Sequence, residues 1–392
     1  MQHEPHGRTP SNPEEITPFS LDVPAQALAD LQRRLAATRW PARETVADAS
    51  QGAPLARMQA LTDHWREAYD WRRIERQLNA WGQYRTRIDG LGIHFLHIRS
   101  KHADAMPLLL THGWPGSVLE FRNVIGPLTD PTRHGGKAED AFHLVIPSLP
   151  GFGFSDVPDA AGWNVPRTAA AWATLMRRLG YARWVAQGGD WGAAVTTALG
   201  RLQPPGLGGI HLSWHLVFPD PMPAQLSAEE QRAVDALQAF RAEGYGYFQQ
   251  QATRPQTLAY GLADSPAGQA AWIYEKLMAW TRPDGDAESL LGRDAILDNI
   301  TLYWLTGTAA SSARIYWENR GGGGNAPLAL PVAASVFPDD IFRAPKRWAQ
   351  RSYPQLIHWN ELPRGGHFAA WEQPALFAQE MRDGFRTLRA PG

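Results

Sequence analysis

The length, composition and charge of the chain exclude several classes of protein. Its 392 residues can form one large domain with a smaller one inserted or appended, and its 38 lysines and arginines nearly balance its 39 aspartates and glutamates. No basic stripe indicates a nucleic-acid-binding surface, and the absence of cysteine excludes disulfides, thiolate metal sites and a cysteine nucleophile. We therefore expect a cytoplasmic protein without nucleic-acid partners.

The N-terminal part of the chain predicts a tail followed by a helical extension. Residues 1–16 are polar and predict a disordered tail, and they lack the apolar core of a signal peptide. No later stretch approaches an apolar membrane span, so we expect no membrane association. Residues 17–83 predict helices too short to form a core of their own, so this extension should wrap the main domain. The helical stretches are Pro24 to Arg39, Leu55 to Glu67, and a third that follows Tyr69 and ends near Asn79.

Two further regions, residues 84–217 and 326–392, predict the two halves of the core domain. Apolar strands alternate with helical stretches, which indicates an α/β fold with a mostly parallel central sheet and helices on both faces. The expected strands are a hairpin of Tyr84 to Ile88 and Ile93 to Ile98 around Asp89-Gly90, then Pro107 to Thr111, Phe142 to Ile146, Trp184 to Ala186, Gly209 to Ser213, Val332 to Phe337 and Leu356 to Trp359. A terminal helix should follow Pro374.

Residues 218–325 predict a helical lid inserted between these two halves. The segment is rich in aromatic residues, contains no buried-strand run, and ends in the glycine-rich linker Gly321 to Asn325. Its aromatic side chains either line an apolar pocket or pack the lid itself. These residues are Trp272, Tyr274, Trp280, Tyr303, Trp304 and Trp317.

The sequence Gln187-Gly188-Gly189-Asp190-Trp191-Gly192 lies between a predicted strand and a predicted helix. A strand, a sharp turn and a helix with glycines around the central residue form a nucleophile elbow, and here that residue is Asp190. The helix N-terminus favours an ionised carboxylate at this position. The alternative is an aspartate that caps a helix after an ordinary glycine-rich turn.

A second loop follows the strand that ends at Thr111. It contains His112, Gly113, Trp114 and Pro115, and it lies where an α/β hydrolase places one oxyanion donor. The backbone N–H groups of Trp114 and Trp191 would then converge on one oxygen. The alternative is a Gly-Pro turn that caps a helix.

A late histidine and an acidic pair complete a possible triad. His367 follows Gly365-Gly366 near the C-terminus, and the base comes last in this fold. Asp340 or its neighbour Asp339 could orient the imidazole, and we favour Asp340, although a solvated Asp-Asp turn is the alternative. Weaker candidates for the base are His112, His94, His97 and His358.

Together these motifs resemble the microsomal-type epoxide hydrolases over about residues 17 to 388. The resemblance rests on His112-Gly113-Trp114-Pro115, Pro150-Gly151-Phe152-Gly153-Phe154-Ser155, Gly189-Asp190-Trp191-Gly192, Arg364-Gly365-Gly366-His367-Phe368, and Pro18-Phe19 through Arg39-Trp40-Pro41. The mammalian members begin with a membrane-anchoring helix, which this sequence lacks, so it resembles the soluble bacterial branch. The resemblance implies an α/β-hydrolase fold and detoxifying hydrolysis of epoxides.

The resemblance also assigns roles to individual residues. It implies Asp190 as the nucleophile, Asp340 as the acid and His367 as the base, with Trp114 and Trp191 as oxyanion donors. Two lid tyrosines should bind the epoxide oxygen. The first is Tyr247, with Tyr245 as the competing choice, and the second is Tyr316 in the segment Ser311-Ser312-Ala313-Arg314-Ile315-Tyr316.

The predicted reaction opens a mid-sized hydrophobic epoxide to a vicinal diol. Asp190 forms an alkyl ester, and water activated by His367 and Asp340 hydrolyses it, without a metal or an organic cofactor. The partners are therefore the epoxide and water, and a homodimer is left open. A haloalkane or haloacid dehalogenase could use the same nucleophile, and a catalytically silent ligand-binding protein could use the same scaffold.

Overall fold

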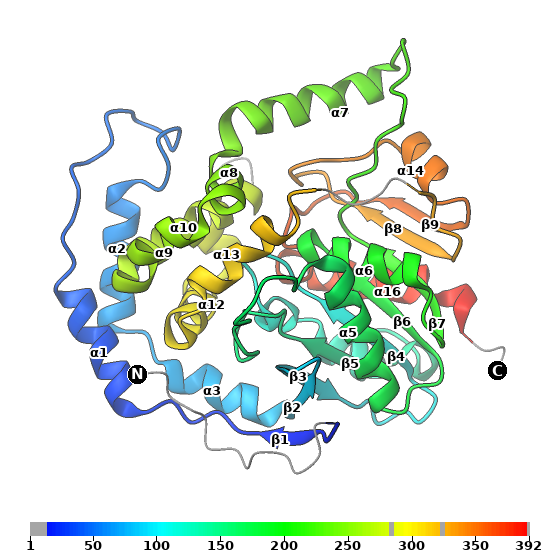
Figure 1. The fold of residues 1–392 in the computed structure, drawn as a ribbon, viewed down its shortest axis with the longest axis horizontal. Helices are drawn as coiled ribbons and strands as arrows, with labels where there is room; N and C mark the ends of the chain where they lie inside the picture. The colour runs from blue at the N-terminus through cyan, green and yellow to red at the C-terminus, as the bar shows by residue number, and fades with distance from the viewer. Residues whose placement is uncertain (1–13, 282–285, 322–325, 390–392) are drawn as a thin grey trace.

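The computed structural model describes residues 14–281, 286–321 and 326–389. Within these ranges the strands form a nine-stranded sheet of order β1-β2-β3-β5-β4-β6-β7-β8-β9 (Figure 1). They are β1 (Thr17–Phe19), β2 (Gln83–Ile88), β3 (Leu91–Ile98), β4 (Met106–Thr111), β5 (Phe142–Pro147), β6 (Trp184–Gly188), β7 (Leu207–Leu212), β8 (Val332–Val336) and β9 (Leu356–Glu361). Most of the predicted tail and of the glycine-rich linker lies outside the described residues.

The sheet is antiparallel at one end and parallel over the rest. β1, β2 and β3 pair antiparallel, and β3 also pairs antiparallel with β5. The strands β5, β4, β6, β7, β8 and β9 pair in parallel. Asp89 and Gly90 join β2 to β3 with φ angles of 50° and 83°, as a two-residue hairpin loop requires. The expected hairpin and mostly parallel sheet are therefore confirmed.

The helices of the described residues fall into three groups. The N-terminal helices are α1 (Ala25–Ala36), α2 (Leu55–Glu67) and α3 (Trp71–Ala80). Those of the core are α4 (Ile125–Thr129), α5 (Val165–Arg178), α6 (Asp190–Leu202), α14 (Lys346–Ser352), α15 (Ala369–Glu372) and α16 (Pro374–Gly384). Those between β7 and β8 are α7 (Ala228–Ala239), α8 (Gly246–Thr253), α9 (Pro255–Asp264), α10 (Pro266–Thr281), α11 (Ala287–Leu291), α12 (Arg293–Thr306) and α13 (Ala309–Glu318).

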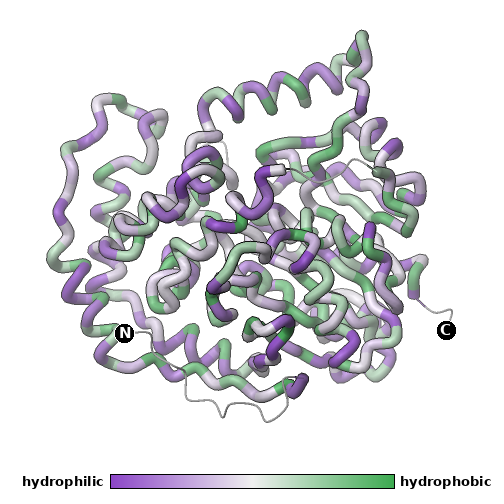
Figure 2. The backbone as a smooth tube through the Cα atoms, in the orientation of Figure 1, coloured by the Kyte–Doolittle hydropathy of each residue, from purple (hydrophilic) through white to green (hydrophobic). Residues whose placement is uncertain are grey.

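Both faces of the parallel sheet are buried. Along β4, Leu109 belongs to the hydrophobic cluster that includes α5 and α6, whereas Leu108 and Leu110 belong to the cluster that includes α4 and α16. This alternation follows from the two-residue period of a strand. Because both faces are apolar, the strands read as continuous hydrophobic runs in the sequence, and green segments occur through the sheet region in Figure 2.

The N-terminal extension is not wholly helical, which corrects the expectation for residues 17–83. Thr17–Phe19 forms β1, which adds an antiparallel strand beside β2 at one edge of the sheet. The ring of Phe19 packs against His94 and Phe154, with ring centroids 5.3 and 5.4 Å apart. A strand of three residues is too short to show a two-residue alternation, so its sequence carries no clear strand signal.

A buried ion-pair network ties this extension to the rest of the protein. The carboxylate of Asp298 on α12 is completely buried, and it lies 2.7 Å from Arg73 on α3 and 2.6 Å from Arg122. Tyr69 donates a third hydrogen bond to it, at 2.8 Å. Removing one partner of such a network leaves a buried charge uncompensated, so these contacts fix α3 against α12.

The described residues between β7 and β8 form helices and no strand, and we refer to this helical insertion as the lid. In Figure 1 the helices α8, α9, α10, α12 and α13 lie together beside the sheet, and α7 extends across the top of the molecule. Among the described helices, none has the combination of length and apolarity needed to cross a bilayer.

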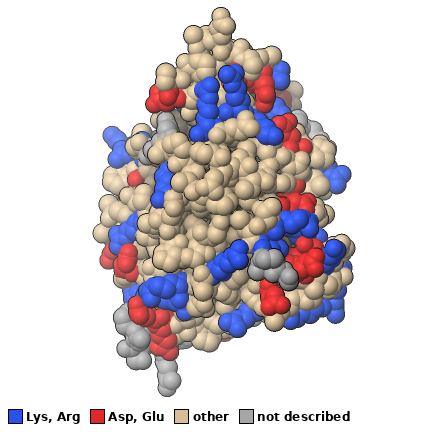
Figure 3. Space-filling model, turned by 90° about the vertical axis from the view of Figure 1, so that its right-hand side faces the viewer, with Lys and Arg blue, Asp and Glu red and all other residues tan. Residues whose placement is uncertain are grey.

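The surface charge is mixed. On the face shown in Figure 3, basic and acidic side chains border a broad central area that carries neither. This interspersed pattern agrees with the nearly balanced composition of the chain.

The register of the parallel strands sets the position of two loops. Thr111, the last residue of β4, pairs with Gly188, the last residue of β6. The loops that follow these strands therefore leave the sheet side by side at its carboxyl edge. Ligands of open α/β sheets bind outside this edge.

Candidate active site

The turn between β6 and α6 holds Asp190 in a strained conformation. Asp190 has a φ of 49°, in the left-handed region that non-glycine residues rarely adopt. A Cβ on Gly188 would lie 2.1 Å from the carbonyl oxygen of Gly192, and one on Gly192 would lie 1.9 Å from that of Thr111. The flanking glycines are thus required for the sharp turn to pack against β4.

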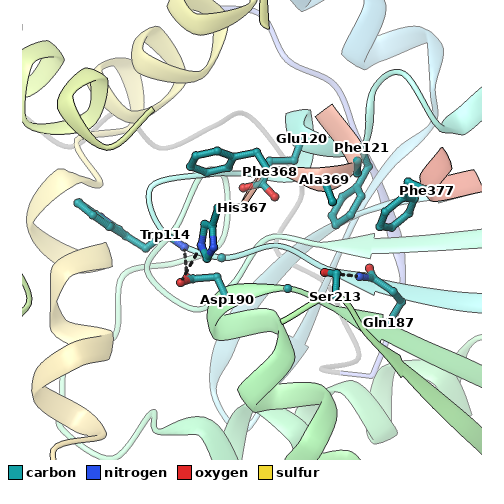
Figure 4. Close-up of a pocket in the computed structure, with 13 residues that line it drawn as sticks. Trp114, Glu120, Phe121, Gln187, Asp190, Ser213, His367, Phe368, Ala369 and Phe377 are labelled. Atoms are coloured by element: carbon teal, nitrogen blue, oxygen red, sulfur yellow. Dashed lines mark hydrogen bonds and ion pairs between the residues drawn. The ribbon is translucent and has the colours of Figure 1, made fainter. Parts of the chain in front are cut away.

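The carboxylate of Asp190 contacts both of the other predicted segments (Figure 4). Its Oδ1 atom accepts a hydrogen bond of 2.8 Å from the backbone N–H of Trp114. Its Oδ2 atom lies 3.3 Å from Nε2 of His367. The structure therefore brings together three segments that are far apart in the sequence.

The other ring nitrogen of His367 contacts the acidic pair after β8. Nδ1 lies 2.8 Å from Oδ1 of Asp340, which also accepts a 2.8 Å hydrogen bond from the N–H of Ile341. Asp339 is exposed, and it contributes its backbone N–H to the carbonyl of Gly365. Of the two aspartates, Asp340 is the one in contact with the imidazole.

The two carboxylates determine the charge of the imidazole. The side chains of His367 and Asp340 are only 2% and 4% exposed, so both groups have lost most of their contact with water. Burial alone lowers the pKa of His367, but the carboxylates of Asp340 and Asp190 outweigh it and raise the pKa to about 10. Burial also raises the pKa of Asp340, and the neighbouring His367 offsets part of that rise. In the resting site the imidazole is therefore a cation between two carboxylates.

Helix α12 of the lid fixes the loop that carries Trp114. Asn299 donates a 2.8 Å hydrogen bond to the carbonyl of Pro115, and Tyr303 donates one of 2.7 Å to the carbonyl of Gly116. On the other side of Asp190, a Cβ on Gly113 would lie 2.4 Å from the Asp190 Cβ. The loop is thus held against Asp190, so its N–H group points at the carboxylate.

His112 supports this loop as a neutral imidazole. Its Nε2 accepts a 3.2 Å hydrogen bond from the N–H of Leu149, which leaves Nδ1 to donate at 3.0 Å to the carbonyl of Gly113. Burial lowers its pKa to about 4. Both ring nitrogens are therefore occupied, and His112 is not available as a base.

The other weaker base candidates have partners of their own. His94 contacts Ser148 and Gln83, His97 contacts Tyr181, and His358 contacts Glu380.

Within the described ranges, no cluster of three or more histidine, aspartate or glutamate side chains could hold a metal ion.

Two lid tyrosines lie over the site. The ring of Tyr247 stacks on Trp114 with centroids 5.3 Å apart, and the ring of Tyr316 meets Trp191 edge-on at 4.9 Å. The two tyrosine rings are themselves 5.7 Å apart. Tyr245, the competing choice, lies at the start of α8 and stacks on Phe248, with its side chain half-buried.

The hydroxyl of Tyr316 is buried without a well-formed hydrogen bond among the described residues, and its nearest polar neighbours are the side chains of Tyr247 and Trp191. Burial raises the pKa of Tyr316 well above its usual value, and Tyr247 and the Asp190 carboxylate raise it further. Burial and Asp190 act on Tyr247 in the same way. Both phenols therefore stay protonated at neutral pH, and one of them has an unused donor beside the carboxylate.

The ring of Trp191 contacts Tyr316 in the site, whereas its backbone N–H makes no hydrogen bond to Asp190. It is the second residue of α6, next to Asp190. Among the hydrogen bonds of the described residues, none runs from the Trp191 N–H to the Asp190 carboxylate. Its role as a second oxyanion donor therefore stays a prediction.

Most of the lid aromatics do not reach the reacting groups. Trp280 does, with its ring centroid 5.1 Å from that of His367 and 5.2 Å from that of Tyr247. The others have different contacts. The hydroxyl of Tyr274 bonds Glu288, Trp272 bonds Gln251, Trp304 packs beneath Arg34, and Trp317 is 37% exposed. Contacts within the protein therefore account for Tyr274, Trp272 and Trp304, whereas Trp317 lies at the surface.

The chain matches known families and proteins over nearly its whole length. Residues 16–121 match the family described as epoxide hydrolase N terminus, and residues 106–258 match the alpha/beta hydrolase fold. A Stigmatella aurantiaca protein that is provisionally assigned as an epoxide hydrolase is 66% identical over 96% of this chain and 86% of its own length. Epoxide hydrolase 1 of Sus scrofa is 35% identical over 94% of this chain and 88% of its own. The chain belongs to the microsomal-type epoxide hydrolase family.

Solved structures of epoxide hydrolases share the fold. The juvenile hormone epoxide hydrolase of Bombyx mori superimposes with a TM-score of 0.87 at 30% identity, over 96% of each chain. The Aspergillus niger epoxide hydrolase gives a TM-score of 0.84 at 29% identity, over 95% of this chain and 96% of its own. The expected α/β-hydrolase fold is thereby confirmed.

In this member of the epoxide hydrolase family, sequence reasoning missed one carboxylate that shapes the base loop. Glu372 is buried, and it accepts 2.8 Å hydrogen bonds from the N–H groups of Gly366 and Phe368, on either side of His367. The N–H of His367 itself donates at 2.9 Å to the carbonyl of Trp280. No sequence motif marks a glutamate five residues after a histidine, so only its contacts in the structure show that Glu372 holds this loop.

Proposed function

We propose that the protein is an epoxide hydrolase that converts a hydrophobic epoxide to a vicinal diol through an alkyl ester on Asp190. One observation carries the proposal. The Asp190 carboxylate lies between a backbone N–H and an imidazole, and two protonated phenols stand over the same site. A nucleophile, a base and donors for a leaving oxygen are the groups that a two-step opening requires.

The first step forms the ester. Trp114 holds Oδ1, so Oδ2, whose contact with His367 is the longer one at 3.3 Å, attacks an epoxide carbon, and a carbon–oxygen bond of the epoxide breaks. Tyr316 and Tyr247 donate hydrogen bonds to the leaving oxygen, and one of them gives up its proton to form the first hydroxyl group. Before this attack the positive imidazole of His367 lies 3.3 Å from Oδ2 of Asp190.

The second step hydrolyses the ester. Alkylation neutralises Asp190 and so removes one of the two carboxylates that raise the pKa of His367. The imidazole, which Asp340 still orients, can then pass its proton to the tyrosine that lost one, and so becomes free to take a proton from water. Water attacks the ester carbonyl carbon, and the oxyanion forms on Oδ1 beside the Trp114 N–H. The acyl carbon–oxygen bond then breaks, and the diol oxygen takes the proton from His367. The new carboxyl group of Asp190 returns a proton to the imidazole, which restores the resting pair.

The walls of the site favour a hydrophobic substrate. Trp114, Trp191 and Trp280 lie around the two phenols with ring contacts between 4.9 and 5.3 Å. The tyrosines also distinguish an epoxide from a haloalkane, because a developing alkoxide needs O–H donors whereas a halide does not. A homodimer, a cytoplasmic location and a role in detoxification stay predictions from the sequence.

Trapping the ester tests the proposal. We expect His367→Ala, incubated with styrene oxide, to gain the mass of one epoxide on the peptide that contains Asp190, because hydrolysis lacks its base. Asp190→Asn should gain nothing. The same incubation with a haloalkane tests the dehalogenase, and an adduct from that compound alone would contradict the proposal. No adduct from either compound would favour a silent binding protein.

A further inference from the structure

A small cavity adjoins the Asp190–His367 pair, and neither Tyr247 nor Tyr316 is among the residues that line it. Its volume is about 20 Å³, which is enough for one water molecule. Polar side chains line it at Glu120, Gln187 and Ser213 in addition to the catalytic pair (Figure 4). Its apolar lining includes Phe121, Phe368, Ala369, Ala370 and Phe377.

The carboxyl group of Glu120 is built into this cavity. Glu120 belongs to the short 3-10 helix η1 (Val118–Phe121) that follows the Trp114 loop. A Cβ on Gly116 would lie 1.2 Å from its Oε1 atom, so the glycine at that position makes room for the carboxyl. Figure 4 shows the carboxyl directed toward His367.

Among the described residues, the carboxyl group of Glu120 has no hydrogen-bond or ion-pair partner that would give it a purely structural role. The described residues give its carboxyl no hydrogen bond or ion pair, although a buried polar group normally has one. Burial raises its pKa to about 8, with His367 lowering and Asp190 raising it, so the group senses both catalytic charges. Glu120 as a whole is of intermediate exposure, and it is one of the residues that line the cavity.

A second polar atom at the cavity also lacks a partner. Gln187 donates from Nε2 to the hydroxyl of Ser213 at 3.3 Å, but its Oε1 atom is buried without a hydrogen bond. An acceptor in this state needs a donor, and a water molecule in the cavity would supply one.

We propose that this cavity seats the water that hydrolyses the Asp190 ester, and that Glu120 accepts a hydrogen bond that holds this water for His367. The inference rests on the proposed two-step function. One O–H of the water points to Glu120, and the other points to Nε2 of His367. The water oxygen forms a bond to the ester carbonyl carbon while its proton passes to Nε2. The tetrahedral intermediate then loses the diol oxygen, which takes that proton.

Two substitutions at Glu120 separate this role from packing. Glu120→Leu keeps a similar volume without a polar atom, whereas Glu120→Gln keeps a carbonyl acceptor. In single turnovers of styrene oxide, we would follow the appearance of the ester by mass of the quenched protein and its disappearance by diol release. Glu139→Gln serves as the matched control, because the Glu139 side chain is 69% exposed.

For Glu120→Leu we expect ester hydrolysis to slow roughly 10- to 100-fold, the effect of losing one hydrogen bond to a charged or reacting group. Ester formation should stay within about threefold of the wild type. The rate of ester hydrolysis should fall less in Glu120→Gln than in Glu120→Leu.

Equal rates of ester hydrolysis in wild type and Glu120→Leu would overturn the inference, as would an equal loss in ester formation and hydrolysis. A wild type that never forms the ester would instead refute the proposed function itself. Thermal unfolding of each variant checks that the fold is intact.

Discussion

The hydroxyl of Tyr303 on α12 donates a 2.7 Å hydrogen bond to the carbonyl of Gly116, two residues after Trp114. Tyr303 is 1% exposed, so this contact is inaccessible to solvent. The lid helix therefore does more than cover the site, because it also positions the N–H that binds the Asp190 carboxylate. This coupling can be tested by removing a single oxygen atom.

We expect Tyr303→Phe to lower both stability and turnover. The lost hydrogen bond leaves a buried carbonyl unpaired, which should cost about 1–3 kcal/mol of unfolding free energy. Turnover should fall roughly 10-fold, because a small displacement of the oxyanion donor weakens the hydrolytic step. Urea unfolding and steady-state kinetics measure the two effects. Tyr260→Phe is the control, since Tyr260 is 72% exposed, and an equal loss in both variants would argue against the coupling.

Tyr316→Phe should slow ester formation without destabilising the protein. The Tyr316 hydroxyl makes no well-formed hydrogen bond in the resting site, so its removal should leave the free energy of unfolding nearly unchanged. Ester formation should slow roughly 100-fold, because one donor to the leaving oxygen is gone. Rapid-quench measurements give this rate. A selective loss in ester hydrolysis would contradict the assignment.

Asp340 and Asp339 form a natural pair of variants. Asp340→Asn removes the charge that orients and stabilises the His367 cation, so ester hydrolysis should slow by about 10²- to 10⁴-fold and the ester should accumulate. Asp339→Asn should behave as the wild type, because this side chain is exposed. The fraction of alkylated protein at steady state, measured by mass, distinguishes them. Accumulation in the Asp339 variant alone would reverse the two roles.

The raised pKa of His367 predicts how stability depends on pH. The folded value is about 10 and the ordinary value is 6.5, so the folded protein holds this proton more tightly. The resulting stabilisation is complete below pH 6.5 and is lost as the pH rises toward 10. The free energy of unfolding of the wild type should exceed that of His367→Gln at low pH, and this difference should shrink by a few kcal/mol across this range. A difference in unfolding free energy between the two proteins that does not change with pH would refute the raised pKa of His367.

Much of this site could be predicted from sequence because its parts are local. The glycines around Asp190 predict a sharp turn, and the position of His367 after the last strand predicts the base. The choices of Asp340 over Asp339 and of Tyr247 over Tyr245 depended instead on resemblance, because neighbouring identical residues differ only in their three-dimensional contacts.

Other features depend on contacts between distant segments. Asn299 contacts Pro115 across 184 positions of sequence, and no local pattern connects them. Glu372 and Glu120 are single carboxylates whose surroundings, rather than their neighbours in sequence, distinguish them from surface residues. The strand β1 is too short to show a period at all.

One measurement tests the covalent mechanism most directly. Wild-type protein in molar excess is allowed a single turnover of styrene oxide in ¹⁸O-labelled water, and the diol and the Asp190 peptide are analysed by mass spectrometry. We expect an unlabelled diol and one heavy oxygen in Asp190, because the new oxygen of the diol comes from the carboxylate. A labelled diol beside an unlabelled Asp190 would show direct attack by water and would contradict the account.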